Sequence, residues 1–391
     1  MAMSGHPLVR SQIAQRDAFE VDALTAQQQF YPTPSVLLER VNSGVGDAVY
    51  GQQGTARIFR LQQPLWSGGR LSAGLDKANA LADAAKRSLE ETRQQLALKA
   101  VQAWADWHLA QLRLKVQQQS VQAHERLMQM VRRRVDEGAS APSELSLTQA
   151  RMDQAQAQQQ SYAAQEAVAR VRLTQLIGRS VSVLDKAEVV HAPQICAEAD
   201  LQDQVLQASA ALQKVRAQQQ AQLHEILERK GDLMPEVYLR LERSDSPGSF
   251  GAGSITNHRV YVGLNSRLGA GLSNLTVLQG LEKRRDALAA EYEATERNVW
   301  ESVQTEHAQW RALQMRLPQL RSAAIASQQT MQAWDRQFLA GKRSWIEVMN
   351  AAREEAQAQI DVADATAGEI GAQWRLAIYC GAVFDDQGEK Q

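Results

Sequence analysis

The chain of 391 residues repeats itself at a constant offset of 203 residues. Sliding the sequence against itself at this offset aligns residue types that rarely coincide by chance. The aligned pairs include Pro32 with Pro235, Gly68 with Gly271, Trp107 with Trp310, Gly138 with Gly341, Glu144 with Glu347 and Gly178 with Gly381. Because one register accommodates all of them, we expect two copies of one structural unit. The period is far longer than that of a solenoid repeat, so each copy is expected to form half of the folded chain.

Long uninterrupted helices are expected in both copies. Residues 75–135 contain neither proline nor glycine, and apolar residues recur there at spacings of three, four or seven, which is typical of coiled coils. At about 1.5 Å per residue this segment forms a rod of roughly 90 Å. Half-length helical segments precede and follow it, so two of them placed end to end can lie alongside one long helix.

Short segments with strand-like alternation lie between the helices. In the second copy Val237, Leu239 and Leu241 alternate with polar residues, which predicts strands with one apolar and one polar face. The polar Arg240 and Glu242 are expected to line an aqueous lumen. Strands of about 9 to 11 residues match the length of a transmembrane β-strand. Four strands cannot enclose a water-filled interior, and open edges in lipid are unfavourable, so closure must come from further copies of the chain.

The predicted fold is mostly α with a small β part, arranged as two repeats of antiparallel coiled-coil helices. The first repeat, residues 1–178, comprises a half-helix, strands 33–42 and 56–65, a long helix 75–135, a tip turn 136–143 and a half-helix 144–177. Residues 179–200 form an equatorial connector. The second repeat, residues 201–391, comprises a half-helix, strands 235–243 and 258–268, a long helix 272–339, a tip turn 340–344, a half-helix 345–379 and a C-terminal tail.

The composition excludes several classes of protein. A net charge of −1 without a basic stripe argues against a nucleic-acid partner. Cys196 and Cys380 are too far apart and too few for a disulfide framework or a zinc module, and they leave the redox compartment open. No phosphate loop, nucleophile elbow or assembled catalytic set is present, so we expect no catalytic residues, cofactor or metal and no enzymatic activity.

The ends and apolar runs of the sequence bear on its location. No run approaches the roughly 18 apolar residues of a membrane-spanning helix. The first residues lack the basic and apolar regions of a signal peptide. We therefore expect either a cytoplasmic protein or a chain that begins after a leader was removed.

Three ordered features resemble the TolC-like family of outer-membrane efflux and secretion channels. They are the segment Gln63-Pro64-Leu65-Trp66-Ser67-Gly68-Gly69-Arg70, the tip Gly138-Ala139-Ser140 ahead of Glu144-Leu145, and the helix end Leu173-x-x-Leu176-x-Gly178. The resemblance extends over nearly the whole chain. It implies a homotrimer in which four strands from each chain form a shared 12-stranded transmembrane β-barrel, continuous with a long α-helical barrel across the periplasm.

The resemblance also implies roles for the two helical reversals. It places adaptor contacts at the tips, on Gly138, Ala139, Ser140, Ser143, Leu145, Gly341, Lys342, Ser344 and Val348. Members of the family close this end with carboxylates and arginines, and here Glu347 occupies a gate-carboxylate position while Asn350 stands where a second carboxylate is expected. Glu144 and Arg343 fall at positions that pair in the closed state, and Phe338 replaces a tyrosine whose hydroxyl it lacks. The alternative is that the glycines and serines only cap helices and that the charges are solvated helix ends.

The function that the resemblance implies is an exit duct of a tripartite export system. The segment Trp66-Ser67-Gly68-Gly69-Arg70 and the cluster Arg132-Arg133-Arg134 are most similar to the branch that serves type I export of large adhesins. Small-molecule or drug efflux is the alternative, and a soluble coiled-coil scaffold is a third reading that the strands disfavour. The implied partners are two further copies of the chain, a periplasmic membrane-fusion adaptor, an inner-membrane transporter of the ABC type reached through it, and outer-membrane lipid. The implied location is the outer membrane, with the helical barrel in the periplasm.

Overall fold

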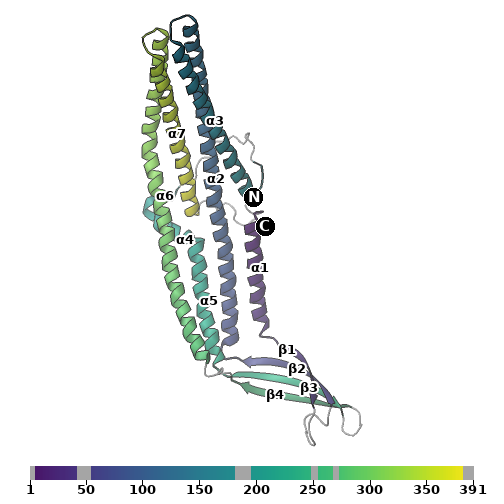
Figure 1. The fold of residues 1–391 in the computed structure, drawn as a ribbon. Coiled ribbons are helices and arrows are strands. Elements are labelled where there is room, and N and C mark those ends of the chain that lie inside the picture. The colour runs from purple at the N-terminus through teal and green to yellow at the C-terminus, as the bar shows by residue number, and fades with distance from the viewer. Residues whose placement is uncertain (1–4, 42–53, 181–194, 248–253, 267–272, 382–391) are drawn as a thin grey trace, which may run out of the picture. The chain divides into compact units, whose positions relative to one another are not determined.

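The computed structural model describes residues 5–41, 54–180, 195–247, 254–266 and 273–381, most of them in helices (Figure 1). The elements in chain order are α1 (Pro7–Gln28), β1 (Thr33–Val41), β2 (Gly54–Trp66), α2 (Arg70–Asp136), α3 (Pro142–Ile177), η1 (Glu198–Asp200), α4 (Leu201–Ala208), α5 (Ala210–Asp232), β3 (Glu236–Pro247), β4 (Ser254–Asn265), α6 (Ser273–Leu339) and α7 (Trp345–Tyr379). The prediction of a mostly helical chain with a small sheet is confirmed. Within the described ranges, no helix combines the length and apolar character that crossing a membrane requires.

The helix and strand bounds lie close to those expected from the sequence. The half-helix 345–379 coincides with α7, and the long helix 75–135 begins five residues earlier, at Arg70. The third strand, expected over 235–243, continues to Pro247. Residues 42, 181–194, 267, 268 and 272 of the predicted strands, connector and long helix lie outside the described residues.

The half-helix expected at the start of the second repeat differs in one respect, because it is divided into α4 and α5. Ser209 between them is extended, with ψ of 108°, and its side chain is buried. Neither a proline nor a glycine marks this break, so the sequence pattern contains no signal for it.

The chain folds into two compact units. The first comprises Met1–Arg10, Glu91–Ser209 and Arg297–Gln391, and the second comprises Ser11–Glu90 and Ala210–Glu296. The long helices α2 and α6 each contribute one part to each unit. Each unit therefore contains segments of both predicted repeats, and Ser209 lies where the chain passes from the first unit to the second.

The second unit contains one antiparallel sheet in the order β1-β2-β3-β4, with its strands side by side (Figure 1). A register shift between Pro64 and Trp66 interrupts the β2·β3 pairing. Two helices of the same unit pack against each other, with Ile226 of α5 in contact with Leu278 and Leu281 of α6. Gly231 of α5 lies so close to α2 that an added Cβ would come 2.6 Å from the backbone nitrogen of Arg70. Only glycine permits this approach of the two backbones.

Both helical reversals of the first unit have the same backbone geometry. Gly138 and Gly341 end α2 and α6 with φ of 73° and 68°, in the left-handed region that glycine adopts without steric cost. After each glycine the next N–H donates to the carbonyl five residues earlier, from Ala139 to Arg134 at 2.7 Å and from Lys342 to Gln337 at 2.9 Å. This is the Schellman motif, so each long helix stops at its glycine and reverses at once.

Side chains of α2 join it to α3 in the first unit. Trp107 of α2 is buried against Leu173 of α3, and its indole N–H donates to Glu166 at 2.9 Å. Gln117 of α2 donates to the carbonyl of Ala155 at 2.9 Å. Trp107 therefore packs between α2 and α3.

The two cysteines form one disulfide. Cys196, shortly before η1, is bonded to Cys380, the residue that follows α7. The bonded pair packs against a cluster that includes Val303 and Trp300 of α6 and Tyr379 of α7. The sequence argument excluded a framework of disulfides but did not foresee this single bond, because the distance of 184 residues along the chain contains no geometric information.

Replacing either cysteine by serine is expected to destabilise the first unit by about 2–4 kcal/mol, because the bond closes a long loop. The Cys196→Ser, Cys380→Ser double variant is expected to lose no more than either single variant, since all three lack the same bond. Urea unfolding followed by the fluorescence of the adjacent tryptophans checks this. Additive losses in the double variant would show that the cysteines act separately.

Candidate functional site

The end of the first unit near the two reversals has its own apolar core. Leu127 and Val131 of α2 pack with residues of α6 and α7. The α6 and α7 members of this cluster are Phe338, Trp345, Val348, Met349 and Ala352. This packing fixes the start of α7 against the ends of both long helices.

Two predicted site residues belong to this core. Val348 has no exposed surface in the chain, so its prediction as an adaptor contact is corrected: its side chain packs inward. Phe338 is 3% exposed, and the guanidinium of Arg134 lies 5.0 Å from its ring centroid. Arg134 also donates to the Phe338 carbonyl at 3.2 Å. Phe338 therefore stabilises the tip through packing and a cation–π contact rather than through a hydroxyl.

Arg343, Ser344 and Glu347 form a polar cluster at the start of α7. One carboxylate oxygen of Glu347 accepts from the backbone N–H of Ser344 at 3.0 Å and from its hydroxyl at 2.9 Å. The other accepts from Arg343 at 2.5 Å. These bonds to Ser344 and to Arg343 hold the pKa of Glu347 below its ordinary value. Glu347 thus caps α7 in the manner of a capping box.

Arg343 lies in the turn between α6 and α7 and is held by residues of both helices. Its guanidinium lies 4.7 Å from the ring centroid of Trp334, and its Nε donates to Gln337 at 3.1 Å. Glu144 lies in the first turn of α3, where its carbonyl accepts from the Thr148 hydroxyl at 2.7 Å. Among the described residues of one chain, Arg343 forms its ion pair with Glu347 and not with Glu144. The pairing of Glu144 with Arg343 remains a prediction about the assembled protein.

Most of the remaining predicted tip residues are on the surface. Gly138, Ala139, Ser143, Gly341, Lys342, Ser344 and Asn350 are exposed, and Ser140 and Leu145 are half-buried. Beside them lie three exposed apolar side chains that the sequence reading missed, namely Leu339 at 67%, Ile346 at 46% and Leu147 at 42%. Only the packed structure shows that they point outward.

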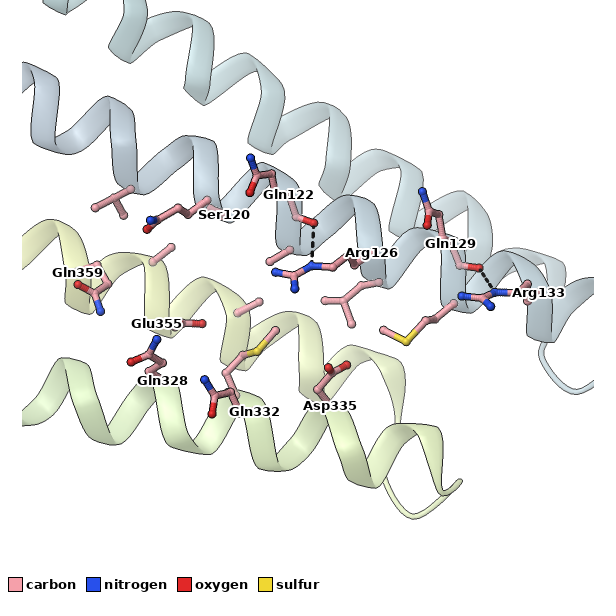
Figure 2. Close-up of a pocket in the computed structure, with 18 residues that line it drawn as sticks. Ser120, Gln122, Arg126, Gln129, Arg133, Gln328, Gln332, Asp335, Glu355 and Gln359 are labelled. Carbon is pink, nitrogen blue, oxygen red and sulfur yellow. Dashed lines mark hydrogen bonds between the residues drawn. The ribbon is translucent and has the colours of Figure 1, made fainter.

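A polar cavity of about 520 Å³ lies between α2, α6 and α7 near the same tip (Figure 2). Burial raises the pKa of Glu355, and the charge of Arg126 opposes this shift. Asp335 Oδ1 is buried and has no hydrogen-bond partner among the described residues. Polar and charged residues make up most of the lining of the cavity, unlike that of the apolar pockets that hold drug-sized ligands.

The arginine run at the end of α2 does not form one patch. Arg133 lines the cavity, Arg134 lies over Phe338, and Arg132 is exposed. Successive residues of a helix point about 100° apart, so three neighbouring arginines necessarily face different surroundings.

The sheet of the second unit has two distinct faces. The strand register places large apolar residues on one face, and they are exposed: Val36, Leu38, Phe59, Leu61, Leu241, Val260, Val262 and Leu264. Arg240 and Glu242 lie on the opposite, polar face with Arg60 and Arg259. The two predicted lumen residues therefore share the polar face of the sheet. Within the described part of the chain, no three histidine, cysteine, aspartate or glutamate residues gather as they would around a metal ion.

Comparison with protein families gives a match to one whose description is Outer membrane efflux protein, over residues 1–179 and 201–382. The match covers most of the chain and confirms the resemblance drawn from the sequence motifs. Among curated proteins no match is found.

Solved structures of channels share the fold. The outer-membrane channel OprN is 19% identical, with a TM-score of 0.81 over 97% of this chain and 88% of that one. VceC from Vibrio cholerae is 15% identical, with a TM-score of 0.81 over 97% and 94%. The open state of the MtrE channel of Neisseria gonorrhoeae is 16% identical, with a TM-score of 0.76 over 97% and 87%. At these identities the likeness concerns the fold.

Acidification is expected to loosen the start of α7. The pKa of Glu347 is lowered from an ordinary value of 4.5, so its bonds to Ser344 and Arg343 are fully present above about pH 4.5 and are lost as the pH falls through the lowered value. Hydrogen exchange of the first-turn amides of α7, corrected for the intrinsic pH dependence, is expected to accelerate below pH 4.5 in the wild type. Glu347→Ala is expected to remove this step, and a step of equal size in that variant would contradict the assignment.

Proposed function

We propose, on the premise that this chain belongs to the Outer membrane efflux protein family, that it is the outer-membrane exit duct of a tripartite export system. Three copies form a 12-stranded transmembrane β-barrel, continuous with an α-helical barrel in the periplasm. Each chain contributes two structural repeats, which the offset of 203 residues and the recurring order of elements support. The duct performs no chemistry, because the inner-membrane partner supplies the energy for transport.

The observation that carries the proposal is the sheet. Its apolar face is exposed, its other face is polar, and in the described residues β1 and β4 each pair with one neighbour only. A sheet in lipid must close on itself, because each unpaired backbone group in hydrocarbon costs several kcal/mol. An apolar outer face and a polar inner face are the pattern of a barrel around water.

The number of strands favours three copies. The four strands alternate in direction, so β4 of one chain and β1 of the next run antiparallel around a ring of any number of copies. Two copies would make a barrel of about eight strands, and side chains fill the interior of a barrel of that size. Three copies are the smallest ring that leaves an aqueous channel, in agreement with the homotrimer that the family resemblance implies.

The tips are the proposed contact surface for a periplasmic adaptor. The exposed Gly138, Ala139, Ser143, Gly341, Lys342 and Ser344 surround the reversals, and the half-buried Ser140 and Leu145 adjoin them. The exposed Leu147, Leu339 and Ile346 add the apolar surface that a partner would bury. Through the adaptor the duct meets an inner-membrane transporter.

Arg343 is the proposed latch at this end. In the chain it binds Glu347, and in the closed trimer it would exchange this carboxylate for Glu144. Exposed ion pairs contribute only about 0–1 kcal/mol each, so the state with the Glu347 pair and the state with the Glu144 pair are close in free energy. Binding of an adaptor can then shift the equilibrium between them. Asn350 is exposed and adds no charge to the cluster.

The sequence of the segment before α2 favours type I secretion, with an ABC-type transporter, over drug efflux. Trp66 ends β2, and Gly68 and Gly69 form the turn into α2 with positive φ. Removing the gene distinguishes the two functions. Loss of a large extracellular adhesin supports type I secretion, whereas increased sensitivity to drugs with secretion intact supports efflux.

Fractionation and conductance test the duct itself. The protein is expected in the outer membrane, to require detergent for extraction, and to form ion-conducting pores in planar bilayers. A soluble rod that leaves bilayers intact would support the scaffold alternative instead.

Arg343→Ala is expected to raise the conductance of these pores, because removal of the guanidinium breaks the latch. Lys342→Ala is the matched control, since it removes a neighbouring exposed charge outside the latch, and its conductance is expected to equal that of the wild type. Equal conductance of the Arg343→Ala and wild-type pores would argue against the latch.

A further inference from the structure

Three arginines on the polar face of the sheet surround one glutamate. The strand register aligns Arg60 of β2, Glu242 of β3 and Arg259 of β4 in one row across the sheet. Arg240 lies in the adjacent row, on the same face. We call Arg60, Arg240 and Arg259 together the arginine row, although Arg240 lies one row of side chains away from the other two. Its members are on the neighbouring strands β2, β3 and β4, so backbone pairing fixes their spacing.

One carboxylate serves all three guanidinium groups. Glu242 Oε2 lies 3.2 Å from Arg60 Nη2 and 3.8 Å from Arg240 Nε, and Glu242 Oε1 lies 4.0 Å from Arg259 Nη1. Its side chain is only 9% exposed, so it is enclosed by the arginines. A single negative charge leaves two positive charges uncompensated in each chain.

Among the residues that the structure describes, no other acidic residue on this face is placed to neutralise the excess. Glu39 lies on β1 opposite Ala56, four residues from the end of the Arg60 row at Ser35, which is about 13 Å along the strand. Glu236, at the start of β3, lies 3.6 Å from Arg70 and is compensated there. The positive excess is therefore local to the arginine row.

Arg240 is held in place by aromatic rings and keeps a hydrogen-bond donor free. Its guanidinium lies 4.5 Å from the ring centroid of Tyr261 and 5.8 Å from that of Tyr238. Its Nε is buried and has no hydrogen-bond partner among the described residues, because Glu242 at 3.8 Å is too distant for a hydrogen bond. The aromatic rings therefore fix the positive charge of Arg240 in position on the polar face.

The arginine row lies at the level of the exposed apolar face. Leu61, Leu241 and Val260 form the row of side chains between the Arg60 and Arg240 rows, on the other side of the sheet. Val260 is 70% exposed. If this face contacts lipid, as the proposed function requires, the arginine row lies inside the hydrocarbon layer. A low-dielectric wall strengthens the field of the charges in the lumen.

We infer that the arginine row makes the pore selective for small anions. This inference rests on the proposed function, in which three copies bring their rows together as one positive belt around the water-filled bore. Rings of arginine or lysine select anions, because they attract them and repel cations. The belt would also attract carboxylate or phosphate groups on exported molecules during their passage.

Reversal potentials in asymmetric KCl test the inference with the full-length protein in planar bilayers. The wild type is expected to conduct chloride in preference to potassium. Arg259→Gln is expected to lower the chloride-to-potassium permeability ratio at least about twofold, from Coulomb's law in water at about 10 Å. Arg259→Lys keeps the charge and is expected to keep the preference. The preference of the wild type is expected to weaken as the salt concentration rises, because mobile ions screen the row.

Arg243→Gln is the matched control. Arg243 neighbours Glu242 on β3 but lies on the opposite face, 3.3 Å from Asp245. The Arg243→Gln substitution removes one positive charge, as Arg259→Gln does. The chloride-to-potassium permeability ratio of Arg243→Gln is expected to equal that of the wild type. Arg60→Gln provides a second variant of the row if Arg259→Gln fails to assemble.

The outcomes separate the two claims. The role of the arginine row in selectivity would be contradicted by wild-type pores that prefer potassium. It would also be contradicted by an equal preference in Arg259→Gln, Arg60→Gln and wild-type pores. Either result would leave the proposed duct in place. Absence of any pore in the wild type would overturn the proposed function itself. A loss of preference in Arg243→Gln equal to that in Arg259→Gln would show that net charge, and not the polar face, determines selectivity.

Discussion

The unpaired backbone groups at the edges of a four-stranded sheet constrain everything else about this protein. Among the described residues, β1 and β4 each have one hydrogen-bonded neighbour, and the adjoining face exposes large apolar side chains. In water such a surface promotes aggregation, and in lipid the open edges are costly. A closed ring of several copies in a membrane satisfies both requirements. The trimer we propose is thus a consequence of hydrogen bonding as much as of family membership.

The same alternation that places apolar residues on one face places a charged row on the other. Glu242 is shared by three arginines, and this sharing lets cations gather on neighbouring strands without complete neutralisation. In the first unit, Arg343 pairs with Glu347 in the first turn of α7, and a second carboxylate partner is proposed across the assembly. The proposed selectivity therefore depends on three arginines that share one carboxylate. The proposed latch depends on one arginine that can pair with either of two carboxylates.

Local signals in the sequence predicted the helices, and packing decided the rest. Gly138 and Gly341 mark the ends of both long helices because glycine adopts the left-handed conformation of a Schellman motif. The break at Ser209 lacks such a signal. Val348 was predicted as an adaptor contact from its place near a tip, but it packs in the core with Leu127 and Val131 of α2. Alternation placed Arg240 and Glu242 on one face, whereas Arg60 and Arg259 joined them only through strand register, which no single segment specifies.

The stoichiometry of the extracted protein tests the central claim most directly. Native mass spectrometry of the full-length chain, released from detergent micelles, counts the copies that close the sheet. We predict complexes of three chains, with no stable monomer after detergent removal. A folded monomer that stays in solution without detergent, or a ring of two, would contradict the account, because neither supplies enough strands for a water-filled barrel.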